Sequence, residues 1–325
     1  MILQTASATQ IKFGELAISV GNFDGVHRGH QKIILRLRED AAQKGLTPAV
    51  LTFSRHPLAI IDSSRIPPRL TALPEKMRLL AHAGVAVAHL WEFNTDLASI
   101  TPEQFMAMLR NKLNVRHVVI GHDHTFGRNR EGNWHLMEQL APALGLTVDH
   151  VEALLDNSHI ISSSHLRKAI LRGDIASANE MLGYRFSHSS KVVVGRGEGR
   201  ALGFPTANLA PIDKITPPPG VYAGWAYWGR QSRPAAINVS FECGERGTIK
   251  PLPGEMGCTI VEANLLYFDG DLYGRQLRLE FIAKVRDEVR FDSRTELIAQ
   301  IKHDVDEIRH ILGQSSCDGR LNGNG

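Results

Sequence analysis

The sequence predicts two domains: an α/β domain built on a parallel sheet, then a small antiparallel β-barrel followed by a C-terminal helix. Three observations support this fold class. Through the first half of the chain, apolar runs of strand length alternate with segments of helical periodicity. After Gly183, glycine and proline become more frequent, and short apolar runs lie between turn signals. A length of 325 residues suits two domains of roughly 150 residues each.

The first predicted unit is a strand, a glycine-punctuated turn and a helix. An apolar run at residues 16–20 leads into residues 21–30, and an apolar-periodic segment follows. His27 and His30 lie near the first turn of that helix, where backbone N–H groups and the helix dipole favour anions. The pattern indicates a cradle for phosphate oxygens. The alternative is a surface turn that happens to contain two histidines.

The next elements repeat this alternation. Buried strands are predicted at residues 48–53, 85–91, 117–120 and 146–151, and helices at residues 73–83 and from Thr101 onward. At Thr101 the order Thr-Pro-Glu-Gln predicts an N-cap, a proline at the first helical position and a glutamine that reaches back. Such alternation predicts a parallel sheet with helices on both faces.

Polar side chains follow two of these strands. Arg55 and His56 come after the strand at residues 48–53. They either face a nucleotide at the carboxyl edge of the sheet or are solvated loop residues. His122, Asp123 and His124 follow a later strand, and their alternate spacing superficially resembles metal ligands. No further ligand stands at a recognisable spacing, so we favour polar contacts to a nucleotide.

A serine cluster at residues 162–164 opens another predicted helix, which ends at Gly173. The hydroxyls, the helix-start amides and Arg167, one turn further along, would form a second anion site. The alternative for the serines is simple N-capping, and Arg167 is the residue that favours phosphate binding. A short helix is then predicted from Asp174 to Gly183.

Composition limits the classes of partner. A hydrophobic fraction of 43% and a charged fraction of 22% fit a soluble globular protein, and a net charge of +3 indicates no extended nucleic-acid surface. Three cysteines without a pattern predict neither a disulfide framework nor a zinc site. No secretion signal or membrane-spanning apolar run is apparent. We therefore expect a cytoplasmic protein without a nucleic-acid or membrane partner, and we take a monomer or weak homo-oligomer as the expected state.

The second half reads as a barrel. Short apolar runs that predict strands lie at residues 191–194, 221–228, 235–239, 260–266 and 277–285. A capping box at residues 293–296 then begins an amphipathic helix, whose apolar face is suited to docking on the barrel. We expect domains at residues 1–185 and 186–312 and a flexible tail at residues 313–325.

Two features of the second half point to chemistry. Residues 195–208 form a glycine-rich segment whose backbone amides would surround phosphates, and Thr206 and Asn208 at its end would hold hydrated Mg²⁺ through neutral oxygens. The alternative is an ordinary hairpin connection. Glu262 lies in an apolar strand near the expected barrel mouth, where a carboxylate is able to accept the proton of an attacking hydroxyl. An isolated glutamate there is more often an outward-facing strand residue.

Several of these motifs resemble a known family. His27-Arg28-Gly29-His30 resembles the H-x-G-H signature of the nucleotidyltransferase superfamily, and residues 161–167 resemble its second, triphosphate-gripping motif. With the loop at residues 125–127 and the Pro-Thr-Ala-Asn of residues 205–208, the chain is similar to bacterial bifunctional riboflavin kinase/FAD synthetases from about residue 15 to about residue 312.

The resemblance implies a Rossmann-like nucleotidyltransferase domain that makes FAD and pyrophosphate from FMN and ATP, followed by a riboflavin kinase barrel. ATP would be co-substrate, FMN and FAD products, and Mg²⁺ would assist both steps. The catalytic residues would be His27, His30, Arg167 and Glu262. ATP would bind at Gly21, Asn22, Phe23, Asp24, Gly29, Asp123, Ser163, Ser164, Gly195, Gly197, Gly199, Arg200 and Gly203. Flavin would bind at Phe126, Arg286 and Phe291, and metal at Thr206 and Asn208.

The chain departs from the family at one segment. The family usually has Asn-x-Gly-x-x-Pro-Thr-Phe ahead of the glutamate strand, whereas residues 238–245 here lack Pro-Thr-Phe and an unusual loop follows at residues 246–257. Two alternatives therefore stay open. One is an adenylyltransferase, for FMN or a flavin analogue, whose second domain only binds flavin. The other is a flavin or nucleotide sensor without catalysis.

Overall fold

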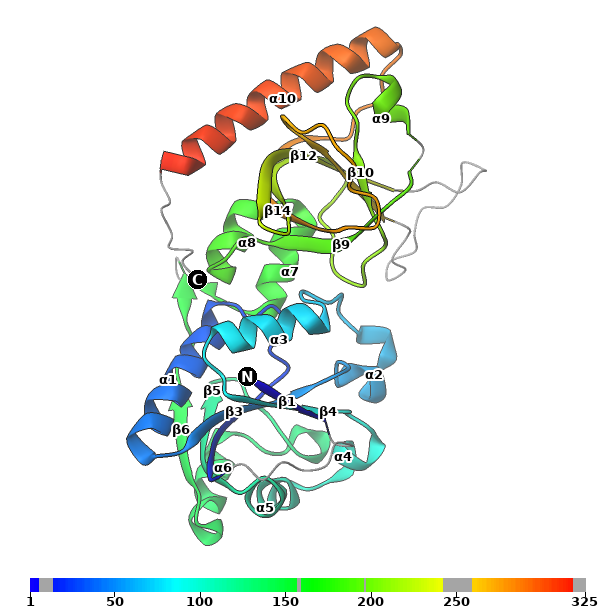
Figure 1. The fold of residues 1–325 in the computed structure, drawn as a ribbon. Coiled ribbons are helices and arrows are strands. Elements are labelled where there is room, and N and C mark those ends of the chain that lie inside the picture. Colours follow the sequence, from blue (N-terminus) through cyan, green and yellow to red (C-terminus); the bar gives the residue numbers. More distant parts are fainter. Residues whose placement is uncertain (6–13, 157–158, 196, 242–258, 318–325) are drawn as a thin grey trace. The chain divides into compact units, whose positions relative to one another are not determined.

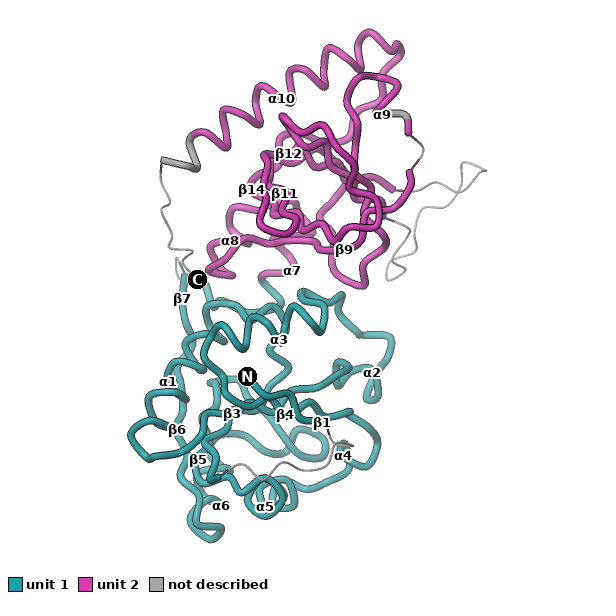
Figure 2. Tube along the Cα trace, viewed as in Figure 1, with its two compact units in different colours: residues 1–165 teal, residues 166–325 magenta. Residues whose placement is uncertain are grey.

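The computed structural model describes residues 1–5, 14–156, 159–195, 197–241 and 259–317. The chain divides into two compact units, residues 1–165 and 166–325 (Figure 2). The predictions for residues 242–257 and for the last eight residues of the tail concern segments outside the described residues.

The first unit is a parallel α/β layer structure, as predicted. The six strands of its main sheet are β1 (Ile2–Thr5), β2 (Leu16–Val20), β3 (Thr47–Phe53), β4 (Val87–Trp91), β5 (Val115–Gly121) and β6 (Thr147–Val151). They pair in the order β1-β4-β3-β2-β5-β6, all in parallel. Chain order reverses between β2 and β5, and ligands of such sheets bind at the carboxyl ends of the strands at this point.

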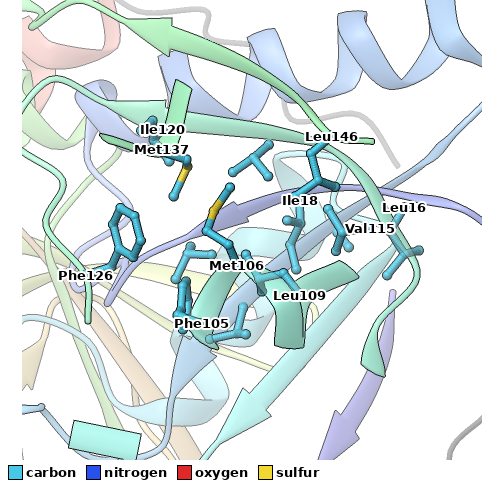
Figure 3. Close-up of a cluster of buried hydrophobic side chains, with 14 of the residues drawn as sticks. Leu16, Ile18, Phe105, Met106, Leu109, Val115, Ile120, Phe126, Met137 and Leu146 are labelled. Carbon is cyan, nitrogen blue, oxygen red and sulfur yellow. The ribbon is translucent and has the colours of Figure 1, made fainter. Parts of the chain in front are cut away.

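Helices cover both faces of this sheet (Figure 1). The unit contains α1 (Arg28–Lys44), α2 (Leu58–Ile61), α3 (Leu73–His82), α4 (Thr95–Ser99), α5 (Pro102–Lys112) and α6 (Trp134–Leu140). The capping box predicted at Thr101 is confirmed: its hydroxyl accepts from the Gln104 N–H, and the Gln104 side chain accepts from the Thr101 N–H. Leu16 and Ile18 of β2 pack against Phe105 and Leu109 of α5 in the core (Figure 3).

Short elements escaped prediction because they carry too few residues for a period to show. The edge strand β1 is four residues long, and the helices α2 and α4 have four and five. The paired strands β7 (Leu155–Asp156) and β8 (His159–Ile160) have two residues each.

The second unit is a closed barrel, also as predicted. Its strands are β9 (Ser187–Val193), β10 (Ala207–Leu209), β11 (Gly220–Trp228), β12 (Gln231–Phe241), β13 (Thr259–Leu265) and β14 (Gln276–Asp287), paired antiparallel in the order β10-β13-β12-β11-β14-β9. The segment predicted as a glycine-rich loop contains the short helix α9 (Glu198–Ala201) and ends in β10.

Helix α10 (Arg294–Cys317) covers the barrel as its amphipathic pattern predicts. Val305, Ile308 and Leu312 pack with Val221 and Ala223 of β11. The Ser293 hydroxyl accepts from the Glu296 N–H, which is one half of the predicted capping box. Among the described residues, no helix combines the length and the apolar character needed to cross a membrane.

Helices α7 (Ser163–Arg172) and α8 (Ile175–Leu182) lie between the sheet and the barrel in sequence. The side chain of Asn179 donates to the Phe281 carbonyl at 3.0 Å and accepts from the Phe186 N–H at 2.7 Å. These bonds attach α8 to the barrel. The second unit accordingly includes α8 and begins at residue 166, whereas composition places the boundary after residue 185.

Candidate active sites

The two histidines of the first motif lie together. His27 is the N-cap of α1, and its Nδ1 accepts from the His30 N–H at 3.4 Å. Their rings are stacked, with centroids 3.7 Å apart and planes at 18°. The motif therefore presents both imidazoles at the start of a helix, at the carboxyl end of β2.

His30 is held in its neutral form. Burial lowers its pKa well below the ordinary value, and the charges of His27 and Lys76 lower it further. Among the described residues, its Nδ1 is buried without a hydrogen-bond partner. A neutral imidazole offers one donor and one acceptor to a ligand.

The turn between β2 and α1 is strained and tightly anchored. Phe23 and Val26 have φ angles of 49° and 38°, in the left-handed region that a β-branched residue rarely adopts. The Asp24 carboxylate accepts from the backbone N–H groups of Leu70 and Thr71 at 3.0–3.1 Å and from the Thr71 hydroxyl at 3.0 Å. Asp24 thus anchors this turn to the segment that precedes α3.

The serine motif meets the histidine motif within the first unit. The Ser163 hydroxyl donates to the Asp24 carbonyl at 2.9 Å. A Cβ on Gly29 would lie 3.1 Å from the His27 Nδ1 and 3.3 Å from the Ile161 carbonyl, so only a glycine fits there comfortably. Ser164 follows on α7, and Arg167 is buried one turn further along, in the second unit.

A cleft opens at the carboxyl ends of β2 and β3. It is lined by Asn22, Asp24, Phe53, Ser54, Arg55, His56, Ala59, Ile66, Pro67, Arg69, Thr71, Leu73 and Lys76. Arg55 and His56 therefore line a cleft, as the nucleotide-facing alternative requires. Gly21 begins the turn beside it, where its N–H donates to the Leu51 carbonyl at 3.0 Å.

The loop after β5 separates its predicted residues. Asp123 is exposed, 3.9 Å from the His122 ring nitrogen. Phe126 is buried in the core, its ring centroid 5.5 Å from that of Phe105. His124 stacks on Phe126, and burial lowers its pKa to about 4 against the opposing effect of Asp123.

The second site is a cluster around Glu262 in the barrel. Glu262 pairs across the sheet with Asn208 of β10 on one side and Asn238 of β12 on the other. The Thr206 hydroxyl donates to Glu262 Oε2 at 2.9 Å, and Asn238 Nδ2 donates to Oε1 at 3.1 Å. Barrel register thus brings together residues that are far apart in the sequence.

The glycine-rich segment packs directly onto this cluster. A Cβ on Gly195 would lie 2.4 Å from Asn208 Nδ2, and one on Gly199 would lie 2.5 Å from the Phe204 carbonyl oxygen and 3.3 Å from Thr206 Oγ1. Gly197 and Gly203 take φ angles of 74° and 86°. Arg200 is exposed at the end of α9.

Arg286 and Phe291, the two remaining residues predicted on the flavin side, lie near each other. Arg286 forms a bidentate ion pair with Asp304 of α10, with N–O distances of 2.8–3.0 Å. Its guanidinium is 5.8 Å from the centroid of the Phe291 ring. The guanidinium therefore joins α10 to β14.

Sequence reasoning missed the roles of Asn238 and Lys76. The partnership of Asn238 with Glu262 depends on strand register, which no local signal gives. Lys76 did have a signal: it shares the helix face of Leu79 and Leu80, and a lysine on a buried face is unusual.

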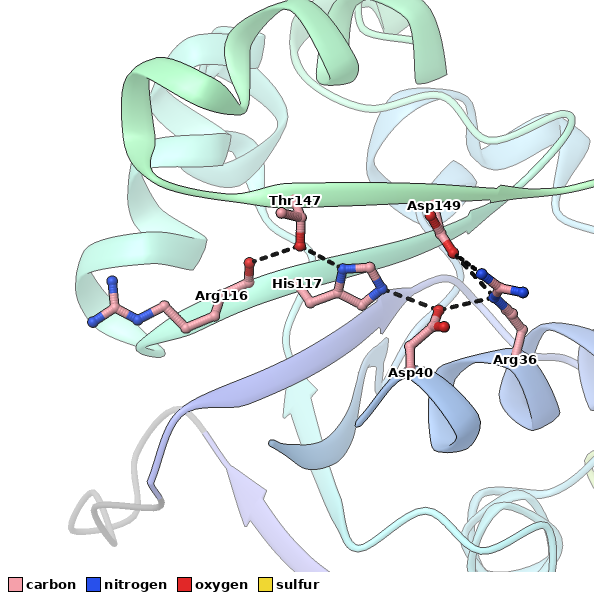
Figure 4. A network of polar contacts seen from close by, with 6 residues as sticks. All are labelled: Arg36, Asp40, Arg116, His117, Thr147 and Asp149. Atoms are coloured by element: carbon pink, nitrogen blue, oxygen red, sulfur yellow. Dashed lines mark hydrogen bonds and ion pairs between the residues drawn. The ribbon is translucent and has the colours of Figure 1, made fainter. Parts of the chain in front are cut away.

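A further polar cluster lies at the amino ends of β5 and β6 (Figure 4). His117 bonds Asp40 at 3.1 Å and Thr147 at 2.7 Å, while Arg36 contacts both Asp40 and Asp149. Burial alone would raise the pKa of Asp40, but the bonds from His117 and Arg36 outweigh it and hold that pKa below its ordinary value. Because Arg36 of α1 bonds both carboxylates and Asp40 of α1 bonds His117 of β5, this cluster is best suited to fastening α1 to the sheet.

Comparison with known proteins agrees with this architecture. A family model described as FAD synthetase matches residues 10–165, and one described as riboflavin kinase matches residues 182–312. A bifunctional riboflavin kinase/FMN adenylyltransferase of Escherichia coli (strain K12) is 34% identical over 298 residues, 91% of this chain and 92% of that protein. One of Bacillus subtilis (strain 168) is 35% identical over 293 residues, 89% and 90% of the two chains.

A crystal structure described as a macrolide-efflux protein from Streptococcus pneumoniae is similar over both units. It superposes with a TM-score of 0.84 at 27% sequence identity, covering 95% of this chain and 99% of that one.

Proposed function

The chain belongs to the bifunctional riboflavin kinase/FMN adenylyltransferase family, with the FAD synthetase domain first, and on that premise we propose how its own residues serve the two reactions. The barrel transfers the γ-phosphoryl group of ATP to riboflavin. The α/β domain then transfers the adenylyl group of a second ATP to the FMN produced. The substrates are small molecules, and we propose that the enzyme is a cytoplasmic monomer or weak homo-oligomer.

In the α/β domain, an FMN phosphate oxygen attacks the α-phosphorus of ATP, and the bond to the α,β-bridging oxygen breaks to release pyrophosphate. No protein nucleophile is required. His27, His30 and Arg167 stabilise the charge that develops on the phosphates. The proposal is supported by the stacked imidazoles at a helix N-terminus, which follows the turn whose residues Asn22 and Asp24 line the cleft. Asn22, Asp123, Ser163 and Ser164 are the proposed supporting contacts.

In the barrel, the ribityl 5′-hydroxyl oxygen of riboflavin attacks the γ-phosphorus, the bond to the β,γ-bridging oxygen breaks, and ADP leaves. Glu262 takes the hydroxyl proton. Asn238 and Thr206 each donate to its carboxylate, which fixes its orientation. Gly195, Gly197, Gly199 and Gly203 let the preceding segment approach the phosphates closely. Arg286 and Phe291 are the proposed flavin-side residues.

The donor set of the barrel cluster fits Mg²⁺. Thr206 and Asn208 offer neutral oxygens beside the Glu262 carboxylate, which is the chemistry this cation prefers. Because the Thr206 hydroxyl gives its proton to Glu262, its lone pairs remain available to a cation. When bound, Mg²⁺ would supply charge neutralisation on the phosphates of ATP.

The single observation that supports the kinase proposal most directly is the convergence of Thr206, Asn208 and Asn238 on Glu262. The test is to supply riboflavin with Mg-ATP, and separately FMN with Mg-ATP, and to follow the flavin products by chromatography. We expect riboflavin to give FMN, part of which goes on to FAD, in the first assay, and FMN to give FAD with pyrophosphate in the second. FAD from supplied FMN, with neither FMN nor FAD from riboflavin, would favour the monofunctional alternative. Flavin binding without turnover in either assay would favour the sensor.

A further inference from the structure

We propose that Lys76 is a positioning residue of the adenylyl-transfer site, which holds the turn that carries His27 and His30 in its working conformation. The inference rests on the proposed function of the first domain. It concerns a residue that lies outside both sequence motifs and touches the motif through the main chain.

Lys76 is a buried cation that joins two strand ends. It is 5% exposed on the inner face of α3. Its Nζ donates to the Asn22 carbonyl at 3.1 Å, the Thr52 hydroxyl at 3.2 Å and the Phe53 carbonyl at 3.0 Å. Asn22 follows β2, while Thr52 and Phe53 end β3, so one ammonium group fastens the carboxyl ends of neighbouring parallel strands.

The three bonds show how Lys76 would act. An ammonium group has three protons, and each has a protein acceptor here. None is left for a phosphate oxygen, so Lys76 acts through the loop. The Asn22 carbonyl also accepts from the Thr52 hydroxyl at 3.1 Å. Asn22 therefore enters the turn fixed by two donors.

The turn needs such an anchor because it is strained. Phe23, directly after Asn22, and Val26, at the end of the turn, both have positive φ angles, a conformation that persists only where the surroundings enforce it. The Asp24 carboxylate is held by the backbone N–H groups of Leu70 and Thr71, just before α3. Helix α3 and the residues preceding it thus hold the turn at Asn22 and at Asp24.

The charge of Lys76 bears on the histidines as well. Burial lowers the pKa of Lys76 to about 8, with Arg69 lowering and Asp24 raising it. The lysine charge in turn contributes to the low pKa of His30, together with burial and His27. The other ionisable groups that line the cleft are Arg55 and His56. Lys76 therefore helps to keep His30 neutral at physiological pH.

The test compares Lys76→Met, Lys76→Arg and Thr52→Val with the wild type, in FAD formation from supplied FMN. Lys44→Met, at an exposed position of α1, is the matched control. Misplacement of catalytic groups by about 1 Å costs roughly 10²-fold in rate. We expect kcat to fall about 10²-fold in Lys76→Met with KM values little changed, and no effect in the control.

The conservative variants separate positioning from simple charge. Lys76→Arg should fail to restore kcat, because a planar guanidinium does not match a tripod of acceptors. Thr52→Val keeps the lysine charge and removes two bonds, the one from Lys76 to the hydroxyl and the one from the hydroxyl to the Asn22 carbonyl. The direct bond from Lys76 to Asn22 remains, so a smaller loss of kcat, about tenfold, is expected. Wild-type kcat in Lys76→Met, a rise in KM alone, or full activity of Lys76→Arg would overturn the proposal. If Lys76→Met does not fold, wild-type kcat in Thr52→Val overturns it.

Two measurements distinguish a positioning role of Lys76 from a purely structural one: the pH dependence of the rate and the titration of His30. The wild-type rate should decline above about pH 8, as Lys76 loses its proton, and Lys76→Met should lack this decline. The His30 ring, titrated by NMR, should show a higher pKa in Lys76→Met. An unchanged titration overturns the inference even if the wild type makes no FAD, an outcome that would refute the proposed function separately.

Discussion

Replacing Glu262 with glutamine tests the proposed kinase base with little change in shape. The carboxylate offers an acceptor to Thr206 on one oxygen and to Asn238 on the other. A glutamine amide has one acceptor oxygen only, so its NH₂ group must face one of these two donors. The substitution therefore removes the proton acceptor and breaks one of the two orienting bonds.

The size of the effect follows from these two losses. A positioned general base contributes typically 10²–10⁴-fold, so kcat for FMN formation should fall by about that factor, equivalent to roughly 2.7–5.4 kcal/mol. The lost hydrogen bond should lower the free energy of unfolding by about 1 kcal/mol. The variant should thus be folded at 25 °C while its kinase activity is almost abolished.

The assay measures both half-reactions on the same preparation. FAD formation from supplied FMN should stay at the wild-type rate in Glu262→Gln, because the other domain performs it. Glu280→Gln is the control: this carboxylate lies in the same barrel and pairs with Arg278 and Arg185, away from the cluster. Near-wild-type FMN formation in Glu262→Gln, or equal losses in the two variants, would refute the role of Glu262.

Three further predictions follow from the packing and the ionisable groups. Gly199→Ala should lower the rate of riboflavin phosphorylation at least roughly tenfold, because its Cβ would lie 2.5 Å from the Phe204 carbonyl oxygen. Gly14→Ala, whose Cβ meets nothing within 4 Å, should leave this rate unchanged. Equal rates in the two variants would contradict this. Asp40→Ala should lower the free energy of unfolding by about 1–3 kcal/mol in urea titrations, since it leaves Nε2 of buried His117 without its hydrogen-bond partner, yet both activities at 25 °C should change little. Loss of activity without loss of stability would contradict a structural role. Burial and the Lys214 charge lower the pKa of His188 to about 3 against the bond to Ile215, so as pH falls below the ordinary value of 6.5 the unfolded chain binds a proton that the folded chain does not. Stability should then decline by about 1.4 kcal/mol per pH unit between roughly pH 6 and pH 4 from this group, and His188→Gln should show a shallower decline in denaturation at pH 7, 6 and 5; identical slopes would contradict it.

The fold was predictable because its signals are local. Apolar runs placed the strands β2 to β6, and the Thr101 cap placed the start of α5. Strand β10 gives no local signal, because its three residues lie between glycines and prolines and are too few to show alternation. Only pairing with β9 and β13 makes it a strand.

The candidate sites were predictable as motifs but not as contacts. His27 and His30 are three residues apart, so their helix start could bring them together. The bonds of Glu262 to Thr206 and Asn238 depend on barrel closure across long sequence separations. Phe126 illustrates the limit: the sequence suggests flavin contact, a role that stays a prediction, while packing buries its ring against Phe105.

The central claim is that one chain holds two independent active sites, and crossing two variants tests it most directly. Each of His30→Asn and Glu262→Gln is given riboflavin with Mg-ATP, then FMN with Mg-ATP, and FMN and FAD are quantified over time. The account predicts that His30→Asn accumulates FMN without FAD, and that Glu262→Gln makes FAD only from supplied FMN. If His30→Asn forms FAD at the wild-type rate, or if either variant loses both reactions while still folded, the claim is contradicted.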